Sequence, residues 1–144
     1  MTSRQPLILH RLTQSYAVVH LPLSTELDLL QPLPGQLWSL TRSITEYSLV
    51  CTEEHLSNYD PSQIRCDGPW QAFYLQGPIP FSACGIIARL TNVLGAAQIG
   101  CFVLSTFDSD VVMVKADSAA QAIRAWQQAD IVVAHGHSNL ATNP

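Results

Sequence analysis

The sequence predicts an α+β protein whose second half has the ferredoxin-like element order β-α-β-β-α-β. Apolar side chains recur every three or four residues over residues 85–98, as in a helix with one buried face. The short polar stretch 105–110 joins two apolar runs, which is typical of a β-hairpin. The spacing Ser118-x-x-Gln121 is that of a capping box and predicts the start of a second helix.

Four apolar runs of strand length complete this order. The first, residues 70–75, ends at Gly77-Pro78, and the later runs are 99–104, 111–114 and 131–134. We expect a four-stranded antiparallel sheet in which the second and third runs pair directly and both helices cover one face. The buried helix faces are predicted to comprise Ile86, Leu90, Val93, Leu94 and Ala97, and then Ala122, Ile123 and Trp126.

The first half has a less regular pattern. Residues 16–21 and 47–51 are predicted strands, and residues 36–40 could form a third. Prolines at 22, 32 and 34 leave room for at most a short helix around residues 24–30. This half is therefore either a degenerate copy of the second half or a source of extra strands for it.

The turn-forming cluster Asp67-Gly68-Pro69 divides the chain. We expect a degenerate half over residues 1–66, a ferredoxin-like domain over residues 67–134, and a disordered tail over residues 135–144.

Composition limits the classes of function. Hydrophobic residues make up 47% of the 144 residues and charged residues 12%, which is enough for a packed core and leaves an apolar surface. We therefore expect a homodimer that covers part of this surface and the sheet edges. The net charge is −4, and the seven Lys and Arg residues are scattered, so we expect no binding to nucleic acid. No apolar stretch approaches membrane-spanning length and no signal peptide is recognised, so the predicted location is the cytoplasm.

The four cysteines are too far apart for a zinc site, and we expect no metal and no cofactor. Each lies among apolar residues, which predicts small buried side chains. His135 and His137 have no further ligands nearby in the sequence. The three tryptophans are predicted to anchor the core or an interface. The cysteines are Cys51, Cys66, Cys84 and Cys101.

Several short motifs occur together in a fixed order. They are Glu46-x-Ser48-Leu49-Val50-Cys51, then Gly77-Pro78-x-Pro80-Phe81 with Gly85-Ile86-Ile87, and then the stretch Ser105-Thr106-Phe107-Asp108-Ser109-Asp110. In this order they resemble small bacterial tandem ACT-domain proteins, which are related to the ACT modules of the CASTOR-type arginine sensors. The resemblance covers residues 16–133. It implies an ACT-type fold, tandem modules and the sensing of amino acids.

A binding site for a free amino acid is predicted where the first helix begins. Free N–H groups in the first turn and the helix dipole suit a carboxylate, and Gly85 permits a close approach to the backbone. The acidic hairpin would hold the positive end of the ligand, although Asp and Ser also favour tight turns without any ligand. The predicted ligand-binding residues are Cys84, Gly85, Ile86, Ile87, Ser105, Thr106, Phe107, Asp108 and Asp110.

Three functions remain open at this point. The first is a non-catalytic regulatory protein that binds an amino acid. The second is a protein–protein interaction module that uses exposed sheet edges and binds no ligand. The third is a small enzyme, which the sequence disfavours because it contains no nucleophile elbow and no phosphate-binding loop.

Overall fold

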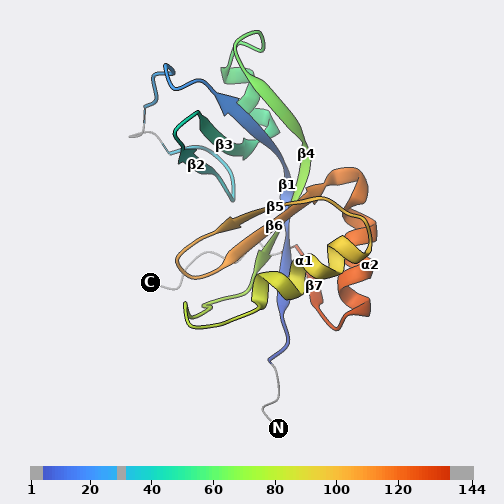
Figure 1. Ribbon diagram of the computed structural model, residues 1–144. Helices are drawn as coiled ribbons and strands as arrows, with labels where there is room; N and C mark the ends of the chain where they lie inside the picture. Colours follow the sequence, from blue (N-terminus) through green and yellow to red (C-terminus); the bar gives the residue numbers. More distant parts are fainter. Residues whose placement is uncertain (1–4, 29–31, 137–144) are drawn as a thin grey trace. The chain divides into compact units, whose positions relative to one another are not determined.

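The computed structural model describes residues 5–28 and 32–136, which divide into two compact units. The larger unit contains residues 5–13 and 71–136, and the smaller unit contains the described residues between 14 and 70. Strands β1 (Ile8–Leu21) and β4 (Arg65–Leu75) each have one part in each unit (Figure 1).

The larger unit has the element order that the sequence predicts. The part of β4 that belongs to this unit is followed by α1 (Ile86–Ala96), β5 (Cys101–Ser105), β6 (Asp110–Lys115), η2 (Ala116–Ser118), α2 (Ala119–Gln128) and β7 (Val132–His135). Strands β5 and β6 pair antiparallel from Cys101 with Val114 to Ser105 with Asp110. The predicted ferredoxin-like α+β order and its central hairpin are therefore confirmed.

The sheet of the larger unit differs from the prediction in one strand. The first part of β1 lies between β7 and β4 and pairs parallel with β7, from Ile8 with Val132 to Arg11 with His135. The four-stranded antiparallel sheet is therefore wrong for this unit, which has five strands and one parallel pair. An apolar run as short as residues 7–9 shows no period of its own, so it becomes a strand only through its distant partners.

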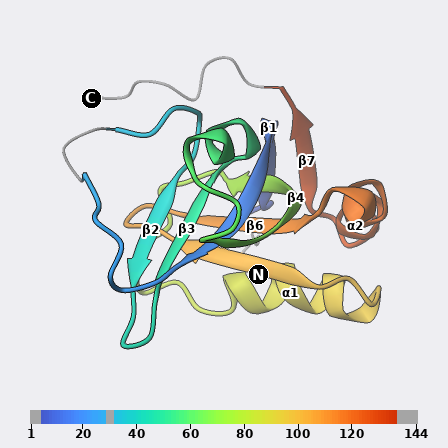
Figure 2. The same cartoon turned by 90° about the horizontal axis from the view of Figure 1, so that it is seen from above.

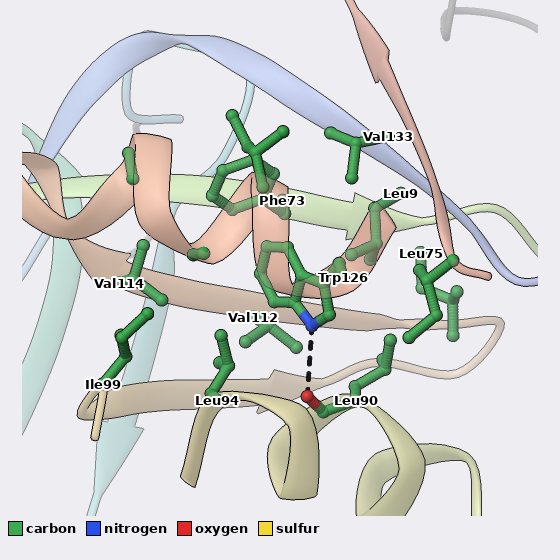
Figure 3. Packing of buried hydrophobic residues seen from close by; sticks show 14 of the residues in the cluster. Leu9, Phe73, Leu75, Leu90, Leu94, Ile99, Val112, Val114, Trp126 and Val133 are labelled. Atoms are coloured by element: carbon green, nitrogen blue, oxygen red, sulfur yellow. Dashed lines mark hydrogen bonds between the residues drawn. The ribbon is translucent and has the colours of Figure 1, made fainter. Parts of the chain in front are cut away.

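One core fills the larger unit, and both helices contribute to it (Figure 3). Trp126 of α2 is fully buried, and its indole N–H donates a hydrogen bond of 3.1 Å to the carbonyl of Leu90 in α1. The ring of Phe73 meets the indole edge-on, with ring centroids 4.9 Å apart. Alternate residues of β4 and β6 face this cluster, so α1 and α2 cover the same face of the sheet, as predicted.

The second helix begins without the predicted capping box. Ser118 precedes α2, but its side chain bonds the carboxylate of Asp117 at 3.4 Å, and Gln121 reaches the carbonyl of Ala97. The capping prediction is therefore wrong, because η2 places Ser118 in a helical backbone conformation that turns its hydroxyl away from the first turn. Burial of Ala122, Ile123 and Trp126 is what holds this helix.

The smaller unit contains β2 (Ser39–Arg42), β3 (Tyr47–Thr52) and η1 (Glu53–Asn58), together with its parts of β1 and β4. Strand β3 pairs antiparallel with both β1 and β2 (Figure 2). A small cluster of Ala17, Val19, Leu21, Leu49 and Cys51 forms its core.

Predictions for the first half are partly confirmed. Residues 16–21 and 47–51 lie in strands, whereas the third strand begins at Ser39 rather than at residue 36. Residues 24–28 form no helix, and residues 29 and 30 lie outside the described part. The predicted turn at residues 67–69 is also wrong, because pairing keeps this stretch extended within β4. The predicted tail was to begin at residue 135, but His135 is the last residue of β7, and from residue 137 onward the tail lies outside the described residues.

Candidate ligand site

A cavity of about 470 Å³ opens beside the start of α1 in the larger unit, and we refer to it as the α1 cavity. Its walls come from the segment that begins β1, from the loop between β4 and α1, and from the first turn of α1. The residues that line it are Gln5, Pro6, Leu7, Ile8, Gln76, Gly77, Pro78, Ile79, Pro80, Ala83, Cys84, Gly85, Ile86 and Arg89.

The backbone at the start of α1 faces this cavity with no side-chain cap. Gly85 is the N-cap residue, and it has a left-handed conformation with φ of 78°. A Cβ atom at this position would meet nothing within 4 Å, so open space lies beside it. The first turn of a helix leaves several N–H groups without helical acceptors and carries the positive end of the helix dipole. This geometry suits a small anion.

Arg89 supplies the positive charge of the α1 cavity. It is the one charged residue among the described residues that line the cavity, and it lies one helical turn after Gly85, whose carbonyl accepts its N–H at 3.0 Å. Its side chain is half-buried and forms no ion pair with any described carboxylate. Sequence reasoning missed Arg89, although its spacing of four residues from Gly85 places both on one helix face.

A hydrogen bond between a buried histidine and an exposed glutamine fixes another wall of the cavity. The Nε2 atom of His10 lies 2.8 Å from the side-chain oxygen of Gln76, and the N–H of Gln76 donates to the carbonyl of Ile8 at 2.8 Å. Since an amide oxygen only accepts, Nε2 of His10 carries the proton in this pair. The imidazole is 4% exposed, so packing and this bond together hold Gln76 in place.

The predicted hairpin residues are not among the residues that line the α1 cavity. The Ser105 hydroxyl donates to the Asp110 carboxylate at 2.6 Å, and the Thr106 N–H donates to the Ser109 carbonyl at 2.8 Å. These bonds are internal to the turn, as the second interpretation of this stretch predicts. Of the predicted binding residues, Cys84, Gly85 and Ile86 line the cavity, whereas Ile87, Ser105, Thr106, Phe107, Asp108 and Asp110 do not.

The hairpin instead supports the loop that forms the cavity wall. The carbonyl of Asp108 accepts the N–H of Ile79 at 2.7 Å, and the Ser109 hydroxyl donates to the carbonyl of Leu75. The rings of Phe81 and Phe107 meet edge-on at 5.2 Å, and each side chain remains 78% exposed. The hairpin thus fixes the loop through its backbone and leaves an aromatic pair exposed to solvent.

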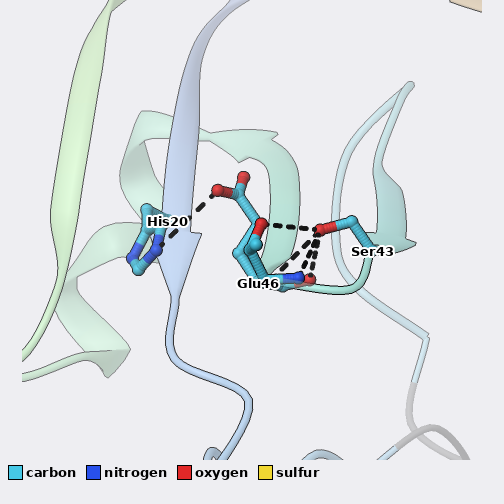
Figure 4. Close-up of polar contacts among 4 residues, drawn as sticks. His20, Ser43 and Glu46 are labelled. Atoms are coloured by element: carbon cyan, nitrogen blue, oxygen red, sulfur yellow. Dashed lines mark hydrogen bonds and ion pairs between the residues drawn. The ribbon is translucent and has the colours of Figure 1, made fainter.

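Glu46, in the turn between β2 and β3, has a local partner. Glu46 lies 3.8 Å from Nε2 of His20, and its backbone closes a turn with Ser43 (Figure 4). No group of three or more metal-ligating side chains occurs among the described residues. Cys51 is buried, but Cys66, Cys84 and Cys101 are exposed, which corrects the prediction that all four lie inside.

Comparison with known proteins identifies the module. Residues 65–128 match the family model of the ACT domain, which is less than half of the 144 residues. The chain contains an ACT domain. No curated protein matches the sequence. Within the described residues, no helix is long and apolar enough to cross a membrane.

Several solved structures share the fold of this chain. A protein of Agobacterium tumefaciens has 27% identity and a TM-score of 0.80, with 96% of this chain and 100% of that chain covered. A Vibrio cholerae protein of unknown function has 18% identity and a TM-score of 0.67 over 88% of this chain and 91% of that one. The regulatory subunit of aspartate kinase from Thermus thermophilus has 11% identity and a TM-score of 0.58, over 81% and 93%. At 18% and 11% identity, the last two similarities show a shared fold and nothing more.

Proposed function

We propose that this protein is a non-catalytic regulatory protein whose ACT domain binds a free amino acid in the α1 cavity. The observation that carries this proposal is that the uncapped N-terminus of α1 and the side chain of Arg89 line the same cavity of about 470 Å³. That volume falls within the range of roughly 300–1,000 Å³ that is usual for small-molecule sites. The aspartate kinase regulatory subunits with the same fold support a regulatory role.

The α-carboxylate of the amino acid would bind at the start of α1. The backbone N–H groups that follow Gly85 and the guanidinium of Arg89 are the donors available to it, and charge-assisted bonds of this kind are the stronger ones. The ammonium would use neutral oxygen acceptors such as the side-chain amide of Gln5, because the described residues that line the cavity include no carboxylate. The apolar residues Leu7, Ile8 and Ile86 would contact the side chain of the ligand.

The finer features of this function are part of the same proposal. We infer a cytoplasmic homodimer, because a chain with 12% charged residues and open sheet edges gains from self-association. Residues 1–66 are proposed to be a degenerate ACT-like half, which would give the tandem arrangement of the CASTOR-type proteins. The predicted contributions of Ile87 and of the hairpin acids stay predictions.

A thermal-shift screen against the twenty amino acids tests the proposal. A ligand that binds only the native state raises the melting temperature with its concentration. Calorimetry with the amino acid found in the screen then measures binding to the Arg89→Gln variant. Its affinity should be about tenfold lower than that of the unaltered chain. Arg124→Gln is the matched control, because Arg124 is exposed on α2 and does not line the cavity.

A second pair of variants tests the approach to the backbone. Gly85→Asn adds a side chain in front of the helix start, and asparagine tolerates the left-handed conformation at this position. Gly136→Asn is its control, since Gly136 also has a positive φ and open space around it but lies outside the cavity. Binding that survives both Gly85→Asn and Arg89→Gln would show that the α1 cavity is not the amino-acid site.

The exposed aromatic pair favours a second candidate function, that of a protein–protein interaction module. Phe81 and Phe107 remain 78% exposed although they contact each other, and exposed large apolar side chains often mark a docking surface. A chain with this function would show no thermal shift with any amino acid. Phe107→Ser would then weaken self-association in light scattering or binding to a partner, whereas Arg89→Gln would leave both unchanged.

A further inference from the structure

A second cavity lies in the smaller unit and is separate from the α1 cavity. It has a volume of about 240 Å³, and we refer to it as the η1 cavity. Strands β2 and β3, the segment before β2, and η1 supply its walls. The residues that line it are Glu26, Leu27, Asp28, Leu33, Trp38, Leu40, Leu49, His55, Asn58 and Tyr59.

The floor of the η1 cavity is apolar and continuous with the core of the smaller unit. Leu49 is buried in that core, and Leu27, Leu33 and Leu40 pack against it. Trp38 lines the cavity and remains 41% exposed, which is unusual for so large an apolar side chain. The floor can therefore take up the apolar part of a small molecule.

Rings and carboxylates surround this floor. Trp38, Tyr59 and His55 provide three aromatic rings, Glu26 and Asp28 provide two carboxylates, and the described lining residues include no lysine or arginine. The faces of aromatic rings and the carboxylates both attract a cation. The charge of this cavity is thus opposite to that of the α1 cavity.

Hydrogen bonds hold the rings of His55 in η1 and of Tyr59, the residue that follows η1, in place. The amide of Asn58 donates to Nδ1 of His55 at 3.2 Å, and Nε2 of His55 lies 3.4 Å from the Tyr59 oxygen. The two rings are edge-on, with centroids 5.4 Å apart. Burial, together with the nearby Cys51 thiol, raises the pKa of Tyr59, so its hydroxyl stays neutral at physiological pH. The rings of His55 and Tyr59 are therefore held in place before a ligand binds, which lowers the entropic cost of binding.

We propose that the η1 cavity binds a small organic cation, an alkylammonium or quaternary ammonium group with a compact apolar body. Its volume is below the roughly 300 Å³ at which sites for drug-sized ligands begin, which excludes a nucleotide or a large ring system. The ammonium group would lie among the rings of Trp38 and Tyr59, with Glu26 as the counter-charge. A chain with two such cavities would sense an amino acid and an organic cation at separate sites.

Choline and tetramethylammonium are the probes, and dimethylbutanol, the uncharged isostere of choline, is the control ligand. Calorimetry on the full chain should show saturable binding of both cations and at least tenfold weaker binding of the alcohol. Trp38→Leu should weaken choline binding about tenfold, because it removes the ring while it keeps an apolar side chain. Glu26→Gln should weaken it about threefold, since a rim charge is partly screened by solvent.

Two variants keep this test independent of folding and of the α1 cavity. Glu54→Gln changes an exposed carboxylate of the same unit that does not line the cavity, and it should bind choline like the unaltered chain. Arg89→Gln should also bind choline normally even if it loses the amino acid. Equal binding of choline and its alcohol isostere, no binding of either cation at millimolar concentration, or full affinity in both Trp38→Leu and Glu26→Gln would overturn the proposal.

Discussion

The two units of the chain bury their apolar residues in different ways. In the larger unit, two amphipathic helices close over one sheet face, and the core includes Trp126, Phe73 and thirteen aliphatic side chains. In the smaller unit the only helical element among the described residues is the 3₁₀ helix η1, and the core cluster has five members. The smaller unit also buries two titratable groups, Tyr16 and Cys51.

This difference has a consequence for stability and for binding. A core made of large interlocking side chains gains more dispersion energy and apolar burial than one made of a few small residues. The smaller unit should therefore open more readily and respond more strongly to alkaline pH. Each cavity borders the core of its own unit, the η1 cavity through Leu49 and the α1 cavity through Leu7.

The largest expected effect tests whether the larger unit dominates stability. Trp126→Ala removes the indole and its bond to Leu90, and it should lower the free energy of unfolding by about 3–5 kcal/mol. Leu49→Ala in the smaller unit should cost about 2 kcal/mol, because it enlarges an open cavity instead of creating a closed void. Urea denaturation of both variants measures the two losses. A greater loss for Leu49→Ala would reverse the ranking of the two cores.

A smaller effect tests how tightly the loop beside the α1 cavity is held. A Cβ atom on Gly77 would lie 2.5 Å from the carbonyl oxygen of Asp108, so the backbone must shift. Gly77→Ala should lower stability by about 1–3 kcal/mol and weaken amino-acid binding as well. Gly95→Ala in α1 has open space at Cβ and should raise stability by about 0.5–1 kcal/mol. Chemical denaturation of both variants is the measurement, and a neutral Gly77→Ala would show that the hairpin does not fix the loop.

The pH dependence of unfolding sharpens the comparison further. Burial raises the pKa of Tyr16 from 10.0 to about 12, and burial with the nearby Cys66 raises that of Cys51 from 9.0 to about 11. In this alkaline range both groups bind more protons in the folded state than in the unfolded state. Their contribution to the free energy of unfolding is therefore complete below pH 9 and is lost as the pH rises from 9 to about 12.

Thermal melts of Tyr16→Phe across this range provide the check. The rise in the pKa of Tyr16 from 10.0 to about 12 corresponds to a contribution of at most about 2.7 kcal/mol to the free energy of unfolding. The variant should therefore lose less stability than the unaltered chain between pH 10 and pH 12, while the two should melt alike at neutral pH. Parallel stability curves for the two proteins would mean that Tyr16 ionises without opening the smaller unit.

The smallest expected effect concerns the start of α2. Ser118→Ala should change the free energy of unfolding by less than about 0.5 kcal/mol, because the hydroxyl bonds Asp117 and not a first-turn N–H. A true N-cap residue would cost about 0.5–2 kcal/mol on the same replacement. A loss in that second range, measured by denaturation, would mean that the capping box forms in solution and that packing alone does not hold α2.

Part of the candidate site could be predicted before the fold was known. Gly85 before an amphipathic run marks a helix start, and the cavity does lie there. Arg89 and Gln76 were missed because a single arginine or glutamine has no motif, and what brings them to the cavity is packing between distant segments. The hairpin acids were grouped with the site from their charge, but the Asp110 carboxylate accepts a hydrogen bond from Ser105 in its own turn, and the Asp108 carbonyl accepts one from Ile79.

The sequence by itself determined the elements of the larger unit, because helix and hairpin patterns depend on spacing along the chain and on local turn chemistry. Only the tertiary structure decided where the first strand goes. Residues 8–11 pair with 132–135, more than a hundred positions away, and no local period encodes such a partner. The same holds for residues 67–69, which read as a turn alone but stay extended beside a neighbouring strand. Pairing over such distances depends on the free energy of the whole sheet, which no short window of sequence contains.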